Sequence, residues 1–177
     1  MIKIIANLFG VLSTLSFIIS FQIKSNKALY LVQSLADVFY CLQFLLLGAT
    51  GGLFNMALQI LRNLLLCKID SWTWLKWKGW GIVFCIPSLI YMFVTWTGLL
   101  DIIPFVAYSV STLAFFTDSA KLIRLSEIFC VSPAWLVYDL IEGAYGGVLT
   151  ECVIWGSVVV SIIRFGWKGL DDPEFKK

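Results

Sequence analysis

The sequence predicts an all-α integral membrane protein in which seven transmembrane helices form two parallel three-helix repeats joined by a linker helix (3+1+3). Three observations lead to this fold class. Hydrophobic residues make up 60% of the 177 residues and charged residues only 14%, whereas soluble domains carry about 25% charged residues. Apolar segments near the ~20 residues that cross a bilayer recur along the chain. A glycine-rich phrase, GATGGLFN at 48–55, returns as GAYGGVLT at 143–150.

The apolar segments are expected to be transmembrane helices. Only a few residues separate the second segment from the third and the sixth from the seventh, so each pair forms a tight antiparallel hairpin. Glycine suits both turns because it adopts positive φ without strain. We therefore interpret the repeated phrase as a hairpin turn rather than a ligand site. The seven expected helices cover residues 4–23, 28–47, 51–69, 79–97, 99–116, 122–142 and 146–165.

Basic residues predict the orientation, because Lys and Arg stay preferentially on the cytoplasmic side. With seven helices, the basic residues of the loops and the C-terminus fall on one side and only Lys3 falls on the other. We expect the N-terminus outside and the C-terminus in the cytoplasm. The residues on the cytoplasmic side are Lys24, Lys27, Lys68, Lys76, Lys78, Lys121, Arg124, Arg164, Lys168, Lys176 and Lys177.

An internal repeat divides the chain, and such repeats decide the fold. An offset of 94 aligns KALYLVQ (27–33) with KLIRLSE (121–127), and the offset becomes 95 at the glycine turns. One residue has therefore been inserted in the sixth helix. The basic residues place both copies in the same orientation, so one extra crossing must join them. The expected parts are a first repeat at 1–69, a Trp/Lys-rich cytoplasmic loop with linker helix at 70–97, a second repeat at 98–168 and a cytoplasmic tail at 169–177.

Polar residues within the membrane are the candidate substrate-binding groups, because polar side chains in hydrocarbon are costly and mark substrate paths. Polar stripes follow the helical period in the third and seventh helices, and Asp37 lies near the midplane. We expect a cavity between the two repeats that touches Asp37, Asn55 and Gln59, with Arg62 toward its cytoplasmic end. The alternative is that these groups only form hydrogen bonds between helices. The predicted substrate-binding residues are Gln33, Asp37, Asn55, Gln59, Arg62, Thr150, Glu151 and Ser157.

Two further patterns concern the membrane boundaries. The run SWTWLKWKGW at 71–80 alternates Trp with Lys, which is typical of an interfacial anchor near anionic lipid headgroups. The outer side carries Asp101, Asp139 and Glu142. An acidic entrance would attract cations, but inward sorting of basic residues explains the same pattern more simply.

Enzyme activity, cofactors and metal ions are not expected. The chain has no His, and its five Cys lack a Cys-x-x-Cys spacing, so a transition-metal site is disfavoured. No nucleophile–base pair or phosphate-binding loop is evident. Nucleic acid is not an expected partner, because the chain has no basic domain surface.

The stretch SFQIKSNKALYLVQSLAD, followed by LLGATGGLFNMALQILRN, resembles the YgjV family of bacterial inner-membrane proteins, mainly over residues 16–63. The 3+1+3 arrangement is similar to SWEET sugar facilitators, PnuC vitamin transporters and other PQ-loop proteins. The Pro-Gln dipeptide of PQ-loop proteins is replaced here by Phe21-Gln22. The resemblance implies a multi-pass protein of the bacterial inner membrane.

It also implies a transporter or facilitator for a small polar metabolite that works by alternating access between two three-helix bundles. The alternative is a non-transporting membrane receptor or interaction protein on the same scaffold. The expected partners are the lipid bilayer and the metabolite. The sequence leaves open whether the chain forms a homo-oligomer.

Overall fold

The computed structural model describes residues 2–23, 25–117 and 119–167. In this part of the chain every regular element is helical. Lys24, Lys168, Lys176, Lys177 and the expected tail at 169–177 lie outside the described residues. The main helices are α1 (Ile2–Gln22), α2 (Asn26–Leu47), α3 (Thr50–Leu66), α4 (Trp80–Val94), α5 (Ile102–Phe115), α6 (Ala120–Ser126), α7 (Ser132–Glu142) and α8 (Tyr145–Phe165).

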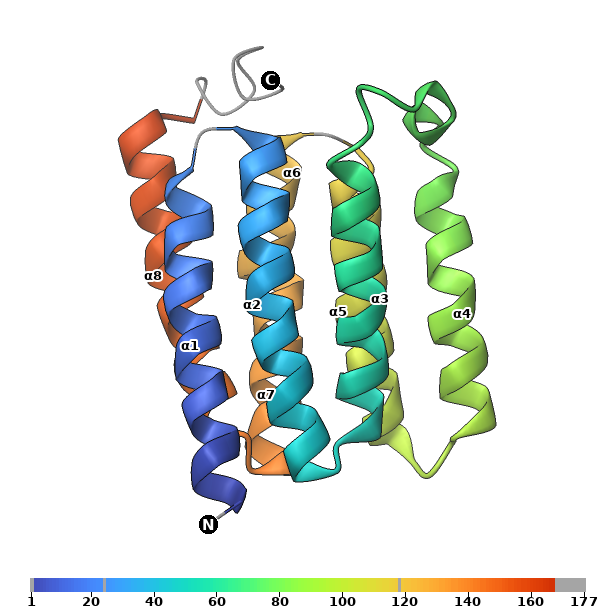
Figure 1. The fold of residues 1–177 in the computed structure, drawn as a ribbon, viewed down its shortest axis with the longest axis vertical. Helices are drawn as coiled ribbons and strands as arrows, with labels where there is room; N and C mark the ends of the chain where they lie inside the picture. Colours follow the sequence, from blue (N-terminus) through green and yellow to red (C-terminus); the bar gives the residue numbers. More distant parts are fainter. Residues whose placement is uncertain (1, 24, 118, 168–177) are drawn as a thin grey trace.

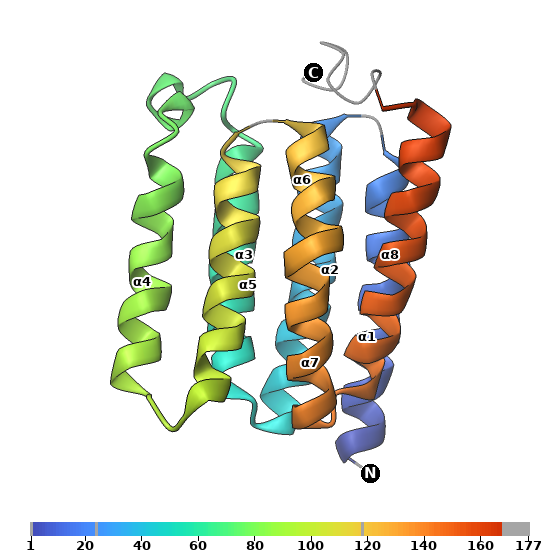
Figure 2. The same cartoon turned by 180° about the vertical axis from the view of Figure 1, so that it is seen from behind.

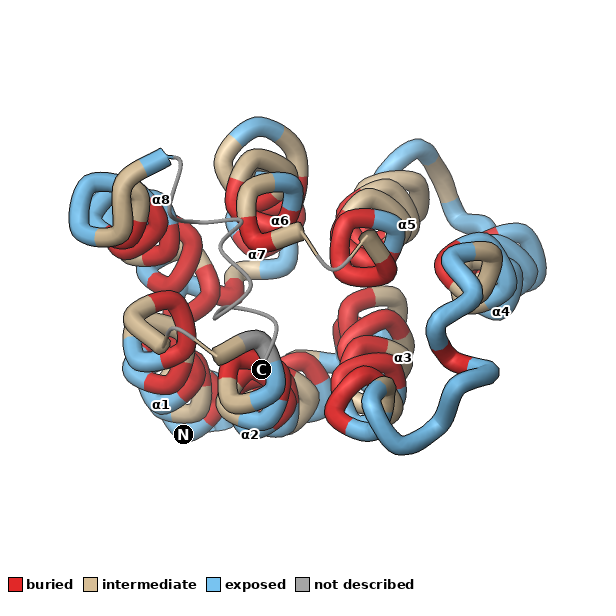
Figure 3. The backbone as a smooth tube through the Cα atoms, turned by 90° about the horizontal axis from the view of Figure 1, so that it is seen from above, coloured by how far each residue is buried: buried red, intermediate tan, exposed pale blue. Residues whose placement is uncertain are grey.

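The helices stand side by side and run alternately up and down (Figures 1 and 2). Seen along the helices, α1, α2 and α3 form one row, and α8, α6–α7 and α5 form a second row facing it (Figure 3). Contacts between α1 and α8 close one edge of the two rows, and contacts between α3 and α5 close the other. Helix α4 lies outside the rows, beside α5 and α3.

The two ends of the helix bundle differ in charge. One end, here the turn end, carries the Gly48 and Gly143 turns and the start of α1. The other end, here the basic end, is where α3, α5 and α8 finish and where α2, α4 and α6 begin. Of the described basic residues outside the bundle interior, Lys3 belongs to the turn end. The others, Lys27, Lys68, Lys76, Lys78, Lys121 and Arg164, belong to the basic end, as does Arg124, whose side chain is buried.

Burial follows the two rows. Buried residues line the faces that meet, and exposed residues cover the outside (Figure 3). The exposed side chains include many large apolar ones, such as Leu15, Leu31, Ile90 and Ile163, as lipid contact requires. Within the described residues, three helices are long and apolar enough to cross a membrane: Ile2–Gln22, Lys27–Leu47 and Tyr145–Phe165. Two shorter apolar helices lie at Trp80–Val94 and Leu99–Phe115.

The repeated glycine phrase begins with a hairpin turn in both places, as predicted. Gly48 ends α2 with φ +76°, and Gly143 ends α7 with φ +70°. The residue after each glycine donates its N–H to a carbonyl one turn back: Ala49 to Phe44 at 3.0 Å and Ala144 to Asp139 at 2.8 Å. This is the usual helix-ending motif that places glycine in the left-handed region.

Residues 120–142 form one continuous helical segment, but the type of helix changes halfway along it. Between α6 and α7 lies a π-helical turn, η3 (Glu127–Val131), in which the Ser132 N–H bonds to the Glu127 carbonyl five residues back. Pro133 follows at once, and its ring clashes with the carbonyl four residues earlier in a regular α-helix. A π-turn accommodates one extra residue, in the helix where the repeat offset changes from 94 to 95.

The helix boundaries differ from the predicted ones mainly at the ends of α3 and α4 and at the start of α5. Helix α3 ends at Leu66 rather than at 69, and α4 ends at Val94 rather than at 97. The tryptophan run folds into a short 3-10 helix, η1 (Thr73–Lys76), whose Leu75 is fully buried. Trp72, Trp74 and Trp77 are exposed, whereas the Trp80 ring packs edge-on against Phe84.

Candidate functional site

A small enclosed cavity lies between the two rows, and every helix of both rows except α6 contributes to its wall. Its volume is about 20 Å³, which is room for about one water molecule. The lining residues are Phe17 from α1, Gln33, Asp37 and Tyr40 from α2, Met56 and Gln59 from α3, Ser111 and Phe115 from α5, Glu127 and Val131 from η3, Trp135 from α7, and Glu151 and Ile154 from α8.

Two polar atoms in this wall lack a protein partner. Gln33 Nε2 and Asp37 Oδ1 are buried and make no hydrogen bond among the described residues. Buried polar groups are nearly always satisfied by protein or by ordered water. The cavity therefore suits a bound water.

On the α3 side of the cavity, Asp37 is tied into a polar network. Asn63 donates its side-chain amide to Asp37 Oδ2 at 2.9 Å, and Arg62 Nε donates to Asn63 Oδ1 at 3.0 Å. Arg62 also donates to Ser111 Oγ at 3.1 Å and to Thr112 Oγ1 at 3.0 Å, and its guanidinium lies 4.0 Å from the centre of the Phe115 ring. The network joins α2, α3 and α5 around one buried cation.

On the α8 side, the Glu151 carboxyl group is held by two hydroxyls. Tyr40 donates to Glu151 Oε1 at 3.2 Å, and Ser132 donates to Glu151 Oε2. Glu127 lines the same cavity from the π-helical turn. Three carboxyl groups therefore border one water-sized space.

The sequence-predicted residues divide into two groups. Gln33, Asp37, Gln59 and Glu151 line the cavity. Asn55, Arg62, Thr150 and Ser157 are buried as well but do not line it. We expected Asn55 in the cavity wall, and the structure places it elsewhere.

The second group forms contacts between neighbouring helices. Asn55 accepts a 2.5 Å hydrogen bond from Ser88 of α4. The hydroxyls of Thr150 and Thr14 are 2.6 Å apart across the contact between α8 and α1, and Ser157 accepts from Gln22 at 3.2 Å. A polar stripe on one helix spans about 100°, which is wide enough to face both a cavity and a neighbouring helix.

Sequence reasoning omitted Glu127 and Tyr40 from the site. Both were recognised as polar positions within helices. The one-residue insertion in the sixth helix was a usable signal for Glu127, since π-turns occur often at functional sites. For Tyr40 the signal was its spacing, because Gln33, Asp37 and Tyr40 share one face of α2 at the helical period.

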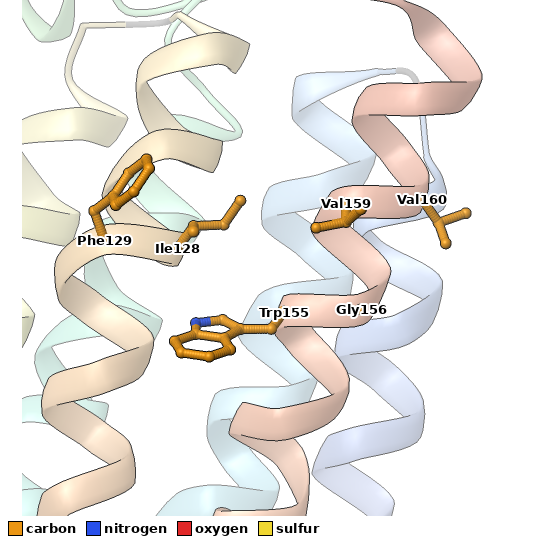
Figure 4. Close-up of a pocket in the computed structure, with 6 residues that line it drawn as sticks. All are labelled: Ile128, Phe129, Trp155, Gly156, Val159 and Val160. Atoms are coloured by element: carbon orange, nitrogen blue, oxygen red, sulfur yellow. The ribbon is translucent and has the colours of Figure 1, made fainter.

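A second hollow lies on the outer surface between η3 and α8 (Figure 4). It is an open cleft of about 570 Å³ lined by Ile128, Phe129, Trp155, Gly156, Val159 and Val160. All six residues are apolar, so in a bilayer the cleft faces lipid hydrocarbon and offers no polar chemistry. Among the described residues there is no group of three or more Cys, Asp or Glu arranged to hold a metal ion.

Comparison with known proteins decides the family. The family model Imp-YgjV, described as a bacterial inner membrane protein, matches residues 4–168. The chain belongs to the Imp-YgjV family. A search of curated proteins and a search of solved structures found no match.

The Imp-YgjV match runs from α1 through the end of α8. It therefore covers both rows of helices, the linker helix α4 and all the residues around the central cavity. Membership agrees with the apolar exterior and identifies the lipid bilayer as the surroundings of this fold.

Proposed function

We propose that this Imp-YgjV protein is a transporter for a small polar metabolite, moved by alternating access between two three-helix units. The observation that carries the proposal is the enclosed cavity shared by both rows, with unpartnered polar atoms on Gln33 and Asp37. A purely structural core would pair these atoms, because an unsatisfied buried polar group is costly. The proposal includes no enzyme activity and no cofactor.

The two units are α1–α3 and α5–α8, parallel copies joined by α4. Support comes from contacts that match under the repeat. A Cβ atom at Gly51 would lie 3.4 Å from the Tyr138 hydroxyl, and one at Gly146 would lie 3.2 Å from Gln43 Nε2. Gly51 and Gly146 correspond at offset 95, as do Gln43 and Tyr138. Exchanged pairs of this kind are expected across a two-fold axis.

The neighbouring helices follow the same exchange. The second close neighbour of Gly51 is Pro104 of α5, and Gly146 lies against Gly10 of α1. Gly10 and Pro104 correspond at offset 94. Gly51 and Gly146 therefore share a second role besides the turn. Each lets the start of its helix, α3 or α8, approach the other unit closely.

The orientation, with the N-terminus outside and the C-terminus cytoplasmic, is part of the proposal. It is supported by the gathering of Lys27, Lys68 and Lys121 at the basic end, while Lys3 stands at the turn end. Basic residues are retained on the cytoplasmic side during insertion.

The proposed cycle opens the cavity to one end at a time. A space for one water does not admit a metabolite, so this conformation corresponds to a closed state between the two open ones. Rocking of one row against the other would widen the space, with Gln33, Asp37, Gln59 and Glu151 as substrate contacts. The π-turn and Pro133 lie beside the cavity, where a weakened helix can bend.

The second function is a receptor or interaction protein that never opens. The dense network around Arg62 and the small cavity volume favour it. The fold alone cannot choose between these functions. The transporter must open the cavity and the receptor keeps it closed, so an experiment that detects opening distinguishes the two functions.

The test is a screen of polar metabolites for thermal stabilisation of the purified full-length protein, since a ligand that binds only the folded state raises stability. Three proteins are compared: wild type, Asp37→Asn and Cys152→Ser, an exposed position on α8. We expect a compound class that raises the Tm of wild type and Cys152→Ser but not of Asp37→Asn. Equal stabilisation of all three proteins, or none from any compound, would contradict the proposed binding role of the cavity.

A further inference from the structure

Asp139 of α7 is an acidic side chain that is fully buried in the described structure. Its exposed fraction is 0%, and neither oxygen of its carboxyl group has a hydrogen-bond partner among the described residues. It forms no ion pair with a basic side chain there. The sequence placed this acid on the outer side, and the structure buries it there, one helical turn below Gly143.

The space for Asp139 is made by a glycine. A Cβ atom at Gly147 of α8 would overlap the Asp139 carboxylate. The corresponding Gly52 of the first unit faces the Phe44 ring instead, and Phe44 corresponds to Asp139 at offset 95. The second unit therefore holds an acid where the first holds an apolar ring. Packing alone does not require this acid, because an apolar ring suffices in the first unit.

The titratable neighbours of Asp139 come from three helices. They are Tyr40 of α2, Glu151 of α8 and Glu142 on α7 itself. The Tyr40 hydroxyl lies close to Asp139, but its hydrogen bonds go to other atoms. It donates to Glu151 Oε1, 3.2 Å away, and to the Gly147 carbonyl oxygen, 3.3 Å away. Tyr40 therefore stands between two carboxyl groups.

These groups form a series from the turn end to the middle of the bundle. Glu142 is exposed at the end of α7, and Asp139 lies one turn deeper. Tyr40 and Glu151 line the central cavity together with Asp37 and Glu127. From Glu142 to Glu127 the helix rises roughly 20 Å at 1.5 Å per residue, which is more than half of a bilayer core.

We propose that Asp139, Tyr40 and Glu151 form a proton relay that connects water at the turn end with the central cavity. The inference rests on the proposed transport function for its purpose, which is coupling of the substrate to a proton. A hydronium ion at the turn end gives a proton to the Asp139 carboxylate. Tyr40 then accepts this proton from Asp139 while giving its own hydroxyl proton to the Glu151 carboxylate, so one proton moves inward, Asp139 is ionised again and Tyr40 ends neutral.

A proton fits these groups better than a metal ion. No metal-holding cluster of Cys, Asp or Glu is present in the described ranges. Arg62, the basic side chain of the network around Asp37, bonds to Asn63, Ser111 and Thr112. A neutral acid costs far less in an apolar interior than an ionised one. Carboxyl groups inside membranes commonly serve in proton relays.

The test measures the proton itself and needs no substrate. Infrared spectra of the full-length protein in lipid, recorded during transfer from H₂O to D₂O, follow hydrogen exchange of protonated carboxyl groups. Glu151→Gln and Asp139→Asn assign the two bands. We expect Asp139→Asn and Tyr40→Phe each to slow exchange at Glu151 tenfold or more, and Glu142→Gln, the exposed acid of the same helix, to leave it unchanged.

Unchanged Glu151 exchange in folded Tyr40→Phe or Asp139→Asn would overturn the relay, as would the absence of any protonated-carboxyl band in wild type. Asp139→Glu, which keeps the acid, serves if Asp139→Asn does not fold, and it should restore fast exchange. The experiments distinguish a failure of the relay from a failure of the transport proposal. The metabolite screen with Asp37→Asn reports on the cavity whether or not protons pass Tyr40.

Discussion

Asn63 donates its side-chain amide to Asp37 across 2.9 Å, and its amide oxygen accepts from Arg62 at 3.0 Å. One neutral side chain thus connects a buried carboxylate to a buried guanidinium. This separation leaves Asp37 Oδ1 free to face the cavity. A direct ion pair with Arg62 would compensate the negative charge of Asp37, and the carboxylate would then attract a ligand less strongly.

Asn63→Ala should therefore destabilise the protein. It removes the partners of Asp37 Oδ2 and Arg62 Nε, and each unsatisfied buried group costs about 1–3 kcal/mol. The control is Leu64→Ala, the next residue on α3, whose side chain faces outward and whose replacement should change stability by no more than about 0.5 kcal/mol. Thermal unfolding in detergent compares them. Equal Tm values for the two variants would show that the network carries no stability.

Gly147→Ala should be costly and Gly156→Ala should not, although both glycines lie on α8. The new methyl group at 147 would overlap the Asp139 carboxylate, whereas nothing lies within 4 Å of a Cβ atom at Gly156. Overpacking costs about 1–3 kcal/mol, and alanine favours a helix by about 1 kcal/mol over glycine. Adding Asp139→Ala should relieve the Gly147→Ala defect. A defect of the same size in both backgrounds would rule out this steric cause.

Replacing the exposed tryptophans of the α3–α4 loop should weaken the anchoring of the protein in the membrane rather than ligand binding. Trp72, Trp74 and Trp77 are exposed at the basic end, where aromatic rings prefer the headgroup region. The triple alanine variant should show lower membrane yield and unchanged ligand-induced stabilisation. Trp80→Ala should reduce thermal stability more, because Trp80 packs on Phe84 and donates to the Trp74 carbonyl at 2.9 Å. Loss of ligand binding in a well-folded triple variant would assign these rings to the site.

Cysteine labelling tests the orientation. In a cysteine-free background, cysteines at Thr50 and Tyr145 should react with an impermeant thiol reagent in spheroplasts, and one at Ser71 only in inverted vesicles. All three positions are exposed. Labelling of Thr50 and Tyr145 from opposite sides would be incompatible with parallel repeats.

Much of the fold was predictable because membrane helices follow hydropathy and length. Both glycine turns and most helix ends match the prediction to within a few residues. The π-turn occurs in the helix where the repeat offset indicated an inserted residue. The end of α4 was placed too late, since the apolar pattern continues past Val94 while the helix stops.

The site was only partly predictable. A single helix shows which side chains are polar, but not which neighbour they meet. Asn55 and Gln59 share one polar stripe, yet Asn55 bonds to α4 and Gln59 lines the cavity. Asp139 was expected on the outer side with Asp101 and Glu142, and the sequence did not show that it is buried there. Its burial depends on Gly147, eight residues later on another helix.

The central claim, that the cavity opens to both sides in turn, is tested most directly by a cysteine at Gln59 in the cysteine-free protein. Gln59 lines the cavity and is 7% exposed. A cysteine at the outward-facing Leu64 should react with a charged, impermeant thiol reagent from neither side, and one at Ser71 from the basic end alone. Alternating access predicts that the Gln59→Cys protein is modified both in spheroplasts and in inverted vesicles. No reaction from either side, or reaction from only one, would contradict it.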